Sequence, residues 1–151
     1  MEQVSINGKM KLSQYFSLGE LTKSNHTDVY NIPSHQAIEN LKRVCEWLEE
    51  LRARVGVPII INSGYRSPQL NKRVGGSATS NHLTGCAVDI RVDGIEQALR
   101  YAVILMDYAD ETKQDFDEIL IEKNRYGAMW LHFAVRPPSM QNRRKIAFIK
   151  A

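Results

Sequence analysis

The sequence contains few cysteines and no long apolar run. Only Cys45 and Cys86 occur among 151 residues, which excludes a small fold held together by several disulfides. Their apolar neighbours indicate two small, buried side chains. No segment approaches the roughly 18 consecutive apolar residues that span a bilayer. The chain begins without a basic region that leads into an apolar one, so we expect neither a membrane span nor a secretory signal.

The excess of positive charge is also small. The 20 Lys and Arg exceed the 17 Asp and Glu by 3, which suits an anionic cell wall but falls short of a nucleic-acid-binding protein. A length of 151 residues, 43% of them hydrophobic, predicts one globular domain without repeats, which we expect to be a monomer. We divide it into an N-terminal arm (1–33), a core (34–135) and a C-terminal segment (136–151).

Apolar periodicity predicts two amphipathic helices. The first runs from His35 to Val55, with Ser34 as its N-cap and Gly56 at its end. The second runs from Ile95 to about Ala109, with Ile95 on the inward face. Both helices have one apolar stripe, so we expect each to pack on a sheet.

Short β-branched and alternating segments predict the sheet. We expect a brief helix over 69–74, a polar loop over 77–85 and five strands, over 58–62, 86–92, 117–122, 129–135 and, at an edge, 145–150. This order of elements predicts an α+β fold, with helices packed on a mostly antiparallel sheet that carries a cleft.

Residue alternation places polar side chains on one face of this sheet. Asp89 lies in mid-strand opposite an apolar face, and His132 and Glu122 point away from the core in the last hairpin. With His82 in the preceding loop, these residues offer two imidazoles and a carboxylate, a ligand set of catalytic zinc that leaves one position for water. A nearby carboxylate must then accept a proton. Glu122 is our candidate, and Glu118 on the same face is the reserve.

Several motifs occur together in a fixed order between residues 12 and 135. They are Ser63-Gly64-Tyr65-Arg66-Ser67, Leu70-Asn71, Val74-Gly75-Gly76, Ser80-x-His82-x-x-Gly85-x-Ala87-x-Asp89 and Trp130-Leu131-His132. This combination resembles the zinc D-Ala-D-Ala peptidase family, which includes bacterial D,D-carboxypeptidases, VanX dipeptidases and phage L-alanyl-D-glutamate endolysins. The family shares its fold with the Hedgehog signalling domain.

The resemblance assigns roles to individual residues. Arg66 matches a substrate-facing arginine that holds a peptide carboxylate or stabilises an oxyanion. Ser80 matches a position that contacts substrate, and Trp130 would form a wall of the cleft. The resemblance implies the same three zinc ligands as the alternation: His82, Asp89 and His132.

The chain departs from the family where many members place the catalytic acid. That position, three residues before the last ligand, is Met129, and the position of a second histidine is Trp130. Other members place the acid at the end of the preceding strand, where this chain has Glu122.

The function implied by the resemblance is a zinc peptidase that acts on peptidoglycan stem peptides, as a D,D-carboxypeptidase or an L,D-endopeptidase. The absence of a visible signal favours a phage-type enzyme, made in the cytoplasm and released to the wall by another protein. The alternatives are a catalytically silent zinc-containing wall-binding module and a phage structural protein.

Overall fold

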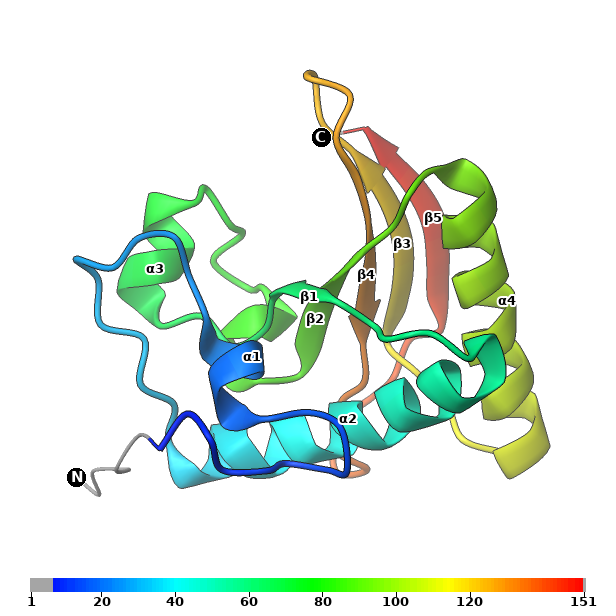
Figure 1. Ribbon diagram of the computed structural model, residues 1–151, viewed down its shortest axis with the longest axis horizontal. Coiled ribbons are helices and arrows are strands. Elements are labelled where there is room, and N and C mark those ends of the chain that lie inside the picture. Colours follow the sequence, from blue (N-terminus) through cyan, green and yellow to red (C-terminus); the bar gives the residue numbers. More distant parts are fainter. Residues whose placement is uncertain (1–6, 151) are drawn as a thin grey trace.

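A computed structural model describes residues 7–150 of the chain (Figure 1). Predictions for residues 1–6, at the start of the N-terminal arm, lie outside the described residues. The helices are α1 (Leu18–Thr22), α2 (His35–Val55), α3 (Pro68–Arg73), the 3-10 helix η1 (Asn81–Thr84) and α4 (Ile95–Thr112). The strands are β1 (Ile61–Ser63), β2 (Ala87–Arg91), β3 (Glu118–Lys123), β4 (Met129–Ala134) and β5 (Lys145–Lys150).

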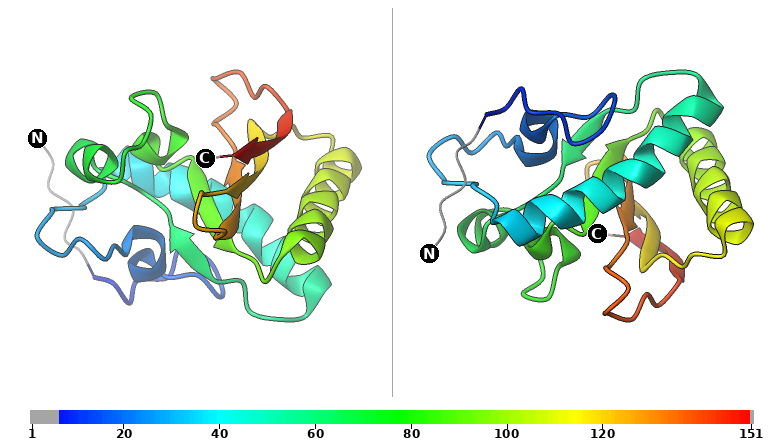
Figure 2. Two further views of the ribbon diagram at one scale, coloured as in Figure 1. Left: turned by 90° about the horizontal axis from the view of Figure 1, so that it is seen from above. Right: turned by 90° about the horizontal axis from the view of Figure 1, so that it is seen from below.

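The five strands form one sheet in the order β1-β2-β4-β3-β5. All neighbours are antiparallel except β5, which runs parallel to β3 at one edge. The long helices α2 and α4 pack against each other and bury one face of the sheet (Figures 1 and 2). The prediction of an α+β fold with a mostly antiparallel sheet is confirmed.

Helix α2 begins and ends where its sequence predicts. The Ser34 hydroxyl accepts a hydrogen bond from the Ala37 amide, and Gly56 ends the helix in the left-handed region at φ 73°. Its apolar stripe is buried, and Trp47 packs edge-on against Phe116. The expectation that both cysteines are buried and unpaired is also confirmed.

Three local predictions are wrong. Strand β1 begins at Ile61 rather than Pro58, because proline has no N–H to donate to a ladder. Ile95, predicted to face inward, is exposed in the first turn of α4, and Tyr101 is buried further along the same helix. Helix α4 continues to Thr112, since Lys113 takes the left-handed conformation that ends it.

The segment predicted as a polar loop, residues 77–85, contains η1. This short helix begins at Ser80, whose hydroxyl accepts from the His82 amide, and ends at Gly85 with φ 76°. A Cβ at Gly85 would approach the Ala37 backbone, so glycine is required there. The η1 turn thereby fixes His82 against the sheet.

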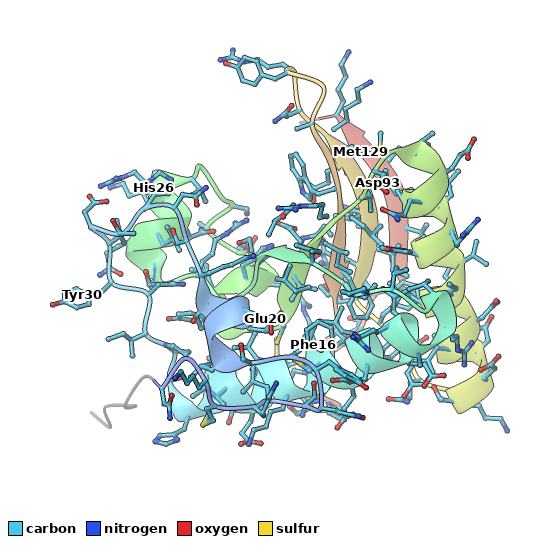
Figure 3. The ribbon with its side chains drawn as sticks, in the orientation of Figure 1. Phe16, Glu20, His26, Tyr30, Asp93 and Met129 are labelled. Carbon is cyan, nitrogen blue, oxygen red and sulfur yellow. The ribbon has the colours of Figure 1, made fainter. Side chains whose placement is uncertain are left out.

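The N-terminal arm packs into the core through Phe16, Leu18 and Leu21 (Figure 3 labels Phe16, to the right of α1). The Tyr65 amide donates to the Leu21 carbonyl at 2.8 Å, and a Cβ at Gly64 would overlap that same carbonyl. The arm therefore fixes the backbone at Gly64, which reappears in the site below. In the described part of the chain, no helix combines the length and apolar character needed to cross a membrane.

Candidate active site

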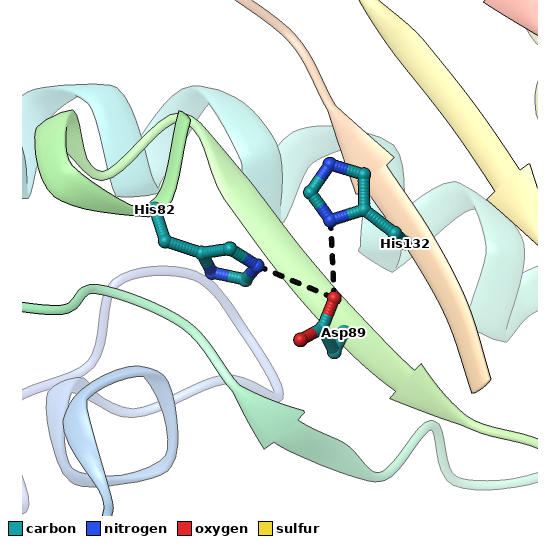
Figure 4. Close-up of side chains that lie close together, drawn as sticks. All are labelled: His82, Asp89 and His132. Carbon is teal, nitrogen blue, oxygen red and sulfur yellow. Dashed lines mark hydrogen bonds and ion pairs between the residues drawn. The ribbon is translucent and has the colours of Figure 1, made fainter. Parts of the chain in front are cut away.

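Three predicted ligands converge on the face of the sheet opposite the long helices. Strand register pairs Asp89 with His132, and His132 with Leu120 on the next strand. His82 reaches the same point from η1 (Figure 4). The predicted placement of these side chains on one face of the sheet is confirmed. Glu118 and Glu122 flank Leu120 on that same face of β3.

The donor atoms of this trio lie within 4.8 Å of one another, and all three residues are buried. Asp89 Oδ1 is 3.3 Å from His82 Nε2 and 3.1 Å from His132 Nδ1. Tetrahedral zinc with bonds of about 2.0–2.1 Å places its ligand atoms about 3.3 Å apart. The two separations from Asp89 Oδ1 therefore fit zinc.

In each histidine, the ring nitrogen that faces away from Asp89 makes a hydrogen bond of its own. His82 Nδ1 donates to the Gly64 carbonyl at 2.7 Å, which leaves Nε2 facing Asp89. His132 Nε2 donates to Glu118 Oε1 at 2.9 Å, which leaves Nδ1 facing Asp89. Metal-bound histidines are commonly oriented by such outer hydrogen bonds.

The electrostatics of the trio are those of a cation site. Burial would raise the pKa of Asp89, but His82 and His132 hold it well below its usual range. Burial would lower the pKa of His132, but its hydrogen bonds to Asp89 and Glu118 raise it to about 10. In the absence of metal, the carboxylates of Asp89 and Glu118 thus favour the positively charged form of His132.

The two glutamates differ in their surroundings. Burial raises the pKa of Glu122 above its ordinary value against the opposing effect of His132, and its Oε1 lies 3.8 Å from His132 Nδ1. Glu118 accepts from His132 and, at 2.8 Å, from Asn81 Nδ2. These hydrogen bonds outweigh burial and lower the pKa of Glu118.

Arg66 lies against the trio rather than apart from it. Its Nη2 is 3.2 Å from Asp89 Oδ2. Its Nε donates to Ser63 Oγ at 3.1 Å, and its Nη1 donates to Asn71 Oδ1 at 3.2 Å. Ser80 and Trp130 line the same cleft. The fold therefore brings together all the residues that the sequence singled out.

Sequence reasoning missed a buried polar network beside the trio. Asp117 is fully buried, and it accepts hydrogen bonds from Arg143 at 2.8 and 3.0 Å and from Asn81 at 2.8 Å. Arg136 lies 3.3 Å from the same carboxylate, and Asn81 links it to Glu118. The only available signal was an aspartate at the start of a buried strand, because its arginine partner lies 26 residues further along the chain.

The trio lies in a cleft of about 670 Å³. Besides Asp89, its lining contains six charged residues: Arg66, Glu118, Glu122, Arg136, Arg143 and Lys145. A polar cleft of this size accommodates a short peptide segment.

We expect Asp117→Asn to destabilise the fold in a pH-dependent way. Burial opposes ionisation of Asp117, but Arg143 and Asn81 lower its pKa from 3.8 to about 2. This shift corresponds to about 2–3 kcal/mol of unfolding free energy, present above pH 4 and lost as the pH falls through about 2. Urea unfolding at pH 7 and near pH 2.5 measures it. Exposed Asp28→Asn is the control, and a difference between wild type and Asp117→Asn that does not shrink in acid would contradict this account.

Two histidines and an aspartate converge in a polar cleft, and the Glu122 carboxylate lies beside them. This arrangement is typical of metal-dependent hydrolases. The model of the family Peptidase M15 matches residues 14–116. The chain therefore belongs to the peptidase M15 family and is a metallopeptidase, as the resemblance to peptidoglycan peptidases implied. The matched segment contains Arg66, His82 and Asp89, and ends before Glu118, Glu122 and His132.

No curated protein matches the chain. Among solved structures, the L-Ala D-Glu endopeptidase ChiX of Serratia marcescens is similar at 23% identity with a TM-score of 0.44. The similarity covers 73% of this chain and 94% of that chain.

Proposed function

We propose that this protein is a zinc-dependent peptidase that hydrolyses an amide bond in peptidoglycan stem peptides, as a D,D-carboxypeptidase or an L,D-endopeptidase. The observation that carries the proposal is the convergence of His82 Nε2, Asp89 Oδ1 and His132 Nδ1 in the cleft of a peptidase M15 chain. A monomeric enzyme of phage type, released to the wall by another protein, is part of the same proposal.

Zinc held by His82, Asp89 and His132 would supply a Lewis acid for the scissile carbonyl and lower the pKa of a water molecule to about 7. The remaining chemistry belongs to the side chains around it. Glu122 accepts a proton from the attacking water and returns it to the leaving amine. Its raised pKa and its place beside His132 Nδ1 support this role.

Arg66 binds the substrate beside the metal ligands. Its hydrogen bonds to Ser63 and Asn71 hold the guanidinium in place, so that it meets a peptide carboxylate or the developing oxyanion without reorganisation. Trp130 and Ser80 form parts of the cleft wall that the peptide contacts.

Glu118 orients His132 rather than acting as the base. Both of its donors, His132 Nε2 and Asn81 Nδ2, engage the same oxygen, Oε1, and Arg143 Nη2 lies 3.6 Å from the other. By accepting the hydrogen bond from His132 Nε2, the Glu118 carboxylate keeps a proton on that nitrogen. The other nitrogen, Nδ1, is then available to bind the metal.

We expect Glu118→Ala to weaken zinc binding by about 10–100-fold, the effect typical of outer-shell partners of metal-bound histidine. Glu118→Gln, whose amide oxygen still accepts from His132, should retain most of the affinity. Competition with a fluorescent chelator measures both variants. Equal affinity in wild type and Glu118→Ala would assign Glu118 another role.

The alternative of a catalytically silent binding module came from the lack of an acid at Met129 and of a histidine at Trp130. Strand alternation places Met129 on the core face of β4, opposite to His132, so an acid at that position could not reach the trio in this hairpin. The missing acid therefore does not favour a silent module, and Glu122 stands on the correct face.

The proposal is tested by incubating the zinc-loaded protein with synthetic stem peptides and measuring released amine. We expect release that stops on addition of a chelator and resumes when excess zinc is restored. A zinc-loaded, folded protein that releases no amine would exclude the peptidase function.

A further inference from the structure

The cleft has a cationic end that has no part in the mechanism proposed above. Arg136, Arg143 and Lys145 line it where β5 begins, on the side of the sheet that carries the metal trio. The Arg143 side chain is 46% exposed although it binds Asp117, and Lys145 is exposed. Both cations therefore remain accessible to a bound molecule.

The backbone beneath these cations is firmly anchored. The Arg143 amide donates to Asp117 Oδ1 at 3.0 Å, and the Lys145 amide donates to the Asp117 carbonyl at 2.9 Å. Between them, the Arg144 amide donates to the Phe116 carbonyl at 2.9 Å. Three consecutive residues are thus fixed to the start of β3.

Arg144 has an unusual conformation that directs its neighbours. Its φ of 51° lies in the left-handed region, which is strained for a residue with a side chain. Its guanidinium pairs with Asp110 at 2.6 Å and Asp115 at 3.0 Å, neither of which lines the cleft. Arg143 and Lys145, on either side of it, both line the cleft. The turn at Arg144 thus places two cations on the cleft side and its own side chain on the other.

The charge at this end of the cleft is positive. The carboxylates that face the three cations are those of Asp117, which is buried beneath them, and Glu118, 3.6 Å from Arg143. Two negative charges offset three positive ones, and Lys145 has no side-chain ion pair within residues 7–150. A bound anion would complete the balance.

We propose that Arg143 and Lys145 form a subsite for a carboxylate of the peptide substrate. This inference rests on the proposed function and adds a preference for an acidic residue near the scissile amide. Lys145 pairs with Glu118 on β3, whereas His132 pairs with Leu120. Lys145 is thus two strands and two residues away from His132, a separation of about 12 Å in the plane of the sheet. The carboxylate therefore belongs roughly one to three residues from the scissile bond.

The test compares two synthetic stem peptides that differ only in a free carboxylate or its carboxamide next to the scissile amide. We expect wild type to cleave the carboxylate peptide with a KM about ten-fold lower. Lys145→Gln should reduce this preference to about two-fold without changing thermal stability. Lys150→Gln, which alters an exposed lysine of β5 outside this cleft, should retain the full preference.

Binding of the same two peptides to zinc-incubated Glu122→Gln protein, measured by calorimetry, separates the subsite from catalysis. A ten-fold preference that Lys145→Gln reduces to about two-fold supports the subsite even if wild type cleaves neither peptide, a result that would reject only the proposed function. Equal affinity for both peptides, or a preference that persists in Lys145→Gln, overturns the subsite even if both peptides are cleaved.

Discussion

Glu122→Gln is expected to lower kcat by about 10²–10⁴-fold, the usual contribution of general acid–base catalysis. The amide retains the size of the side chain and cannot accept a proton. Glu122 is not one of the three ligands, so zinc binding should change little. Steady-state hydrolysis of a stem peptide and zinc stoichiometry are measured on the same preparation.

The matched control is Glu96→Gln, an exposed glutamate in the first turn of α4, which should leave kcat unchanged. If Glu122→Gln kept wild-type kcat while Glu118→Gln lost it, the base would be Glu118 and the roles of the two glutamates would be exchanged. The hydrogen bonds of Glu118 to His132 and Asn81 argue against that outcome.

His82→Ala is expected to remove the metal and, with it, all measurable hydrolysis. Its Nε2 is one of three buried donor atoms, and the remaining pair is a poor tetrahedral site. Wild type should hold one zinc per chain and gain thermal stability when zinc is added, since a ligand that binds only the folded state stabilises it. Neither effect should persist in His82→Ala.

The control for this variant is His26→Ala. His26 lies in the loop before α2, beside α3 and away from the sheet (Figure 3). Metal analysis of both dialysed variants is direct, and a full equivalent of zinc retained by His82→Ala would place the metal elsewhere.

Much of the trio follows from the sequence because strand alternation has a strict period of two. An aspartate in the middle of an otherwise apolar strand, and a histidine between Leu131 and Phe133, both had to face away from the core. That the two face one another is a matter of register, which pairs Asp89 with His132 across adjacent strands. The order of residues in the chain does not contain that register. The resemblance to the peptidase family implied only that the two residues are ligands of one metal.

The features that sequence reasoning missed depend on contacts between distant segments. Asp117 meets its partner Arg143 through a turn whose geometry depends on a non-glycine residue with positive φ, Arg144. No local pattern marks such a turn. Helix α4 likewise ends at a lysine in the left-handed conformation rather than at a glycine, so its last turn was not predicted.

The distinction between the two glutamates also required the structure. Both occupy the same face of β3, and alternation alone cannot separate them. Asn81, immediately before a ligand in the chain, donates to Glu118 and not to Glu122. Together with the hydrogen bond from His132 Nε2, this contact occupies Glu118, and it supports the proposal that Glu122 is the carboxylate that transfers the proton.

The most direct test of the account is mass spectrometry of purified peptidoglycan digested by the zinc-loaded protein, with and without a chelator. We expect new peptide fragments that differ from the parent by hydrolysis of one amide bond, present with zinc and absent with the chelator. Their masses identify the bond. Peptidoglycan left intact by the zinc-loaded enzyme, or fragments that form equally in the presence of the chelator, would contradict it.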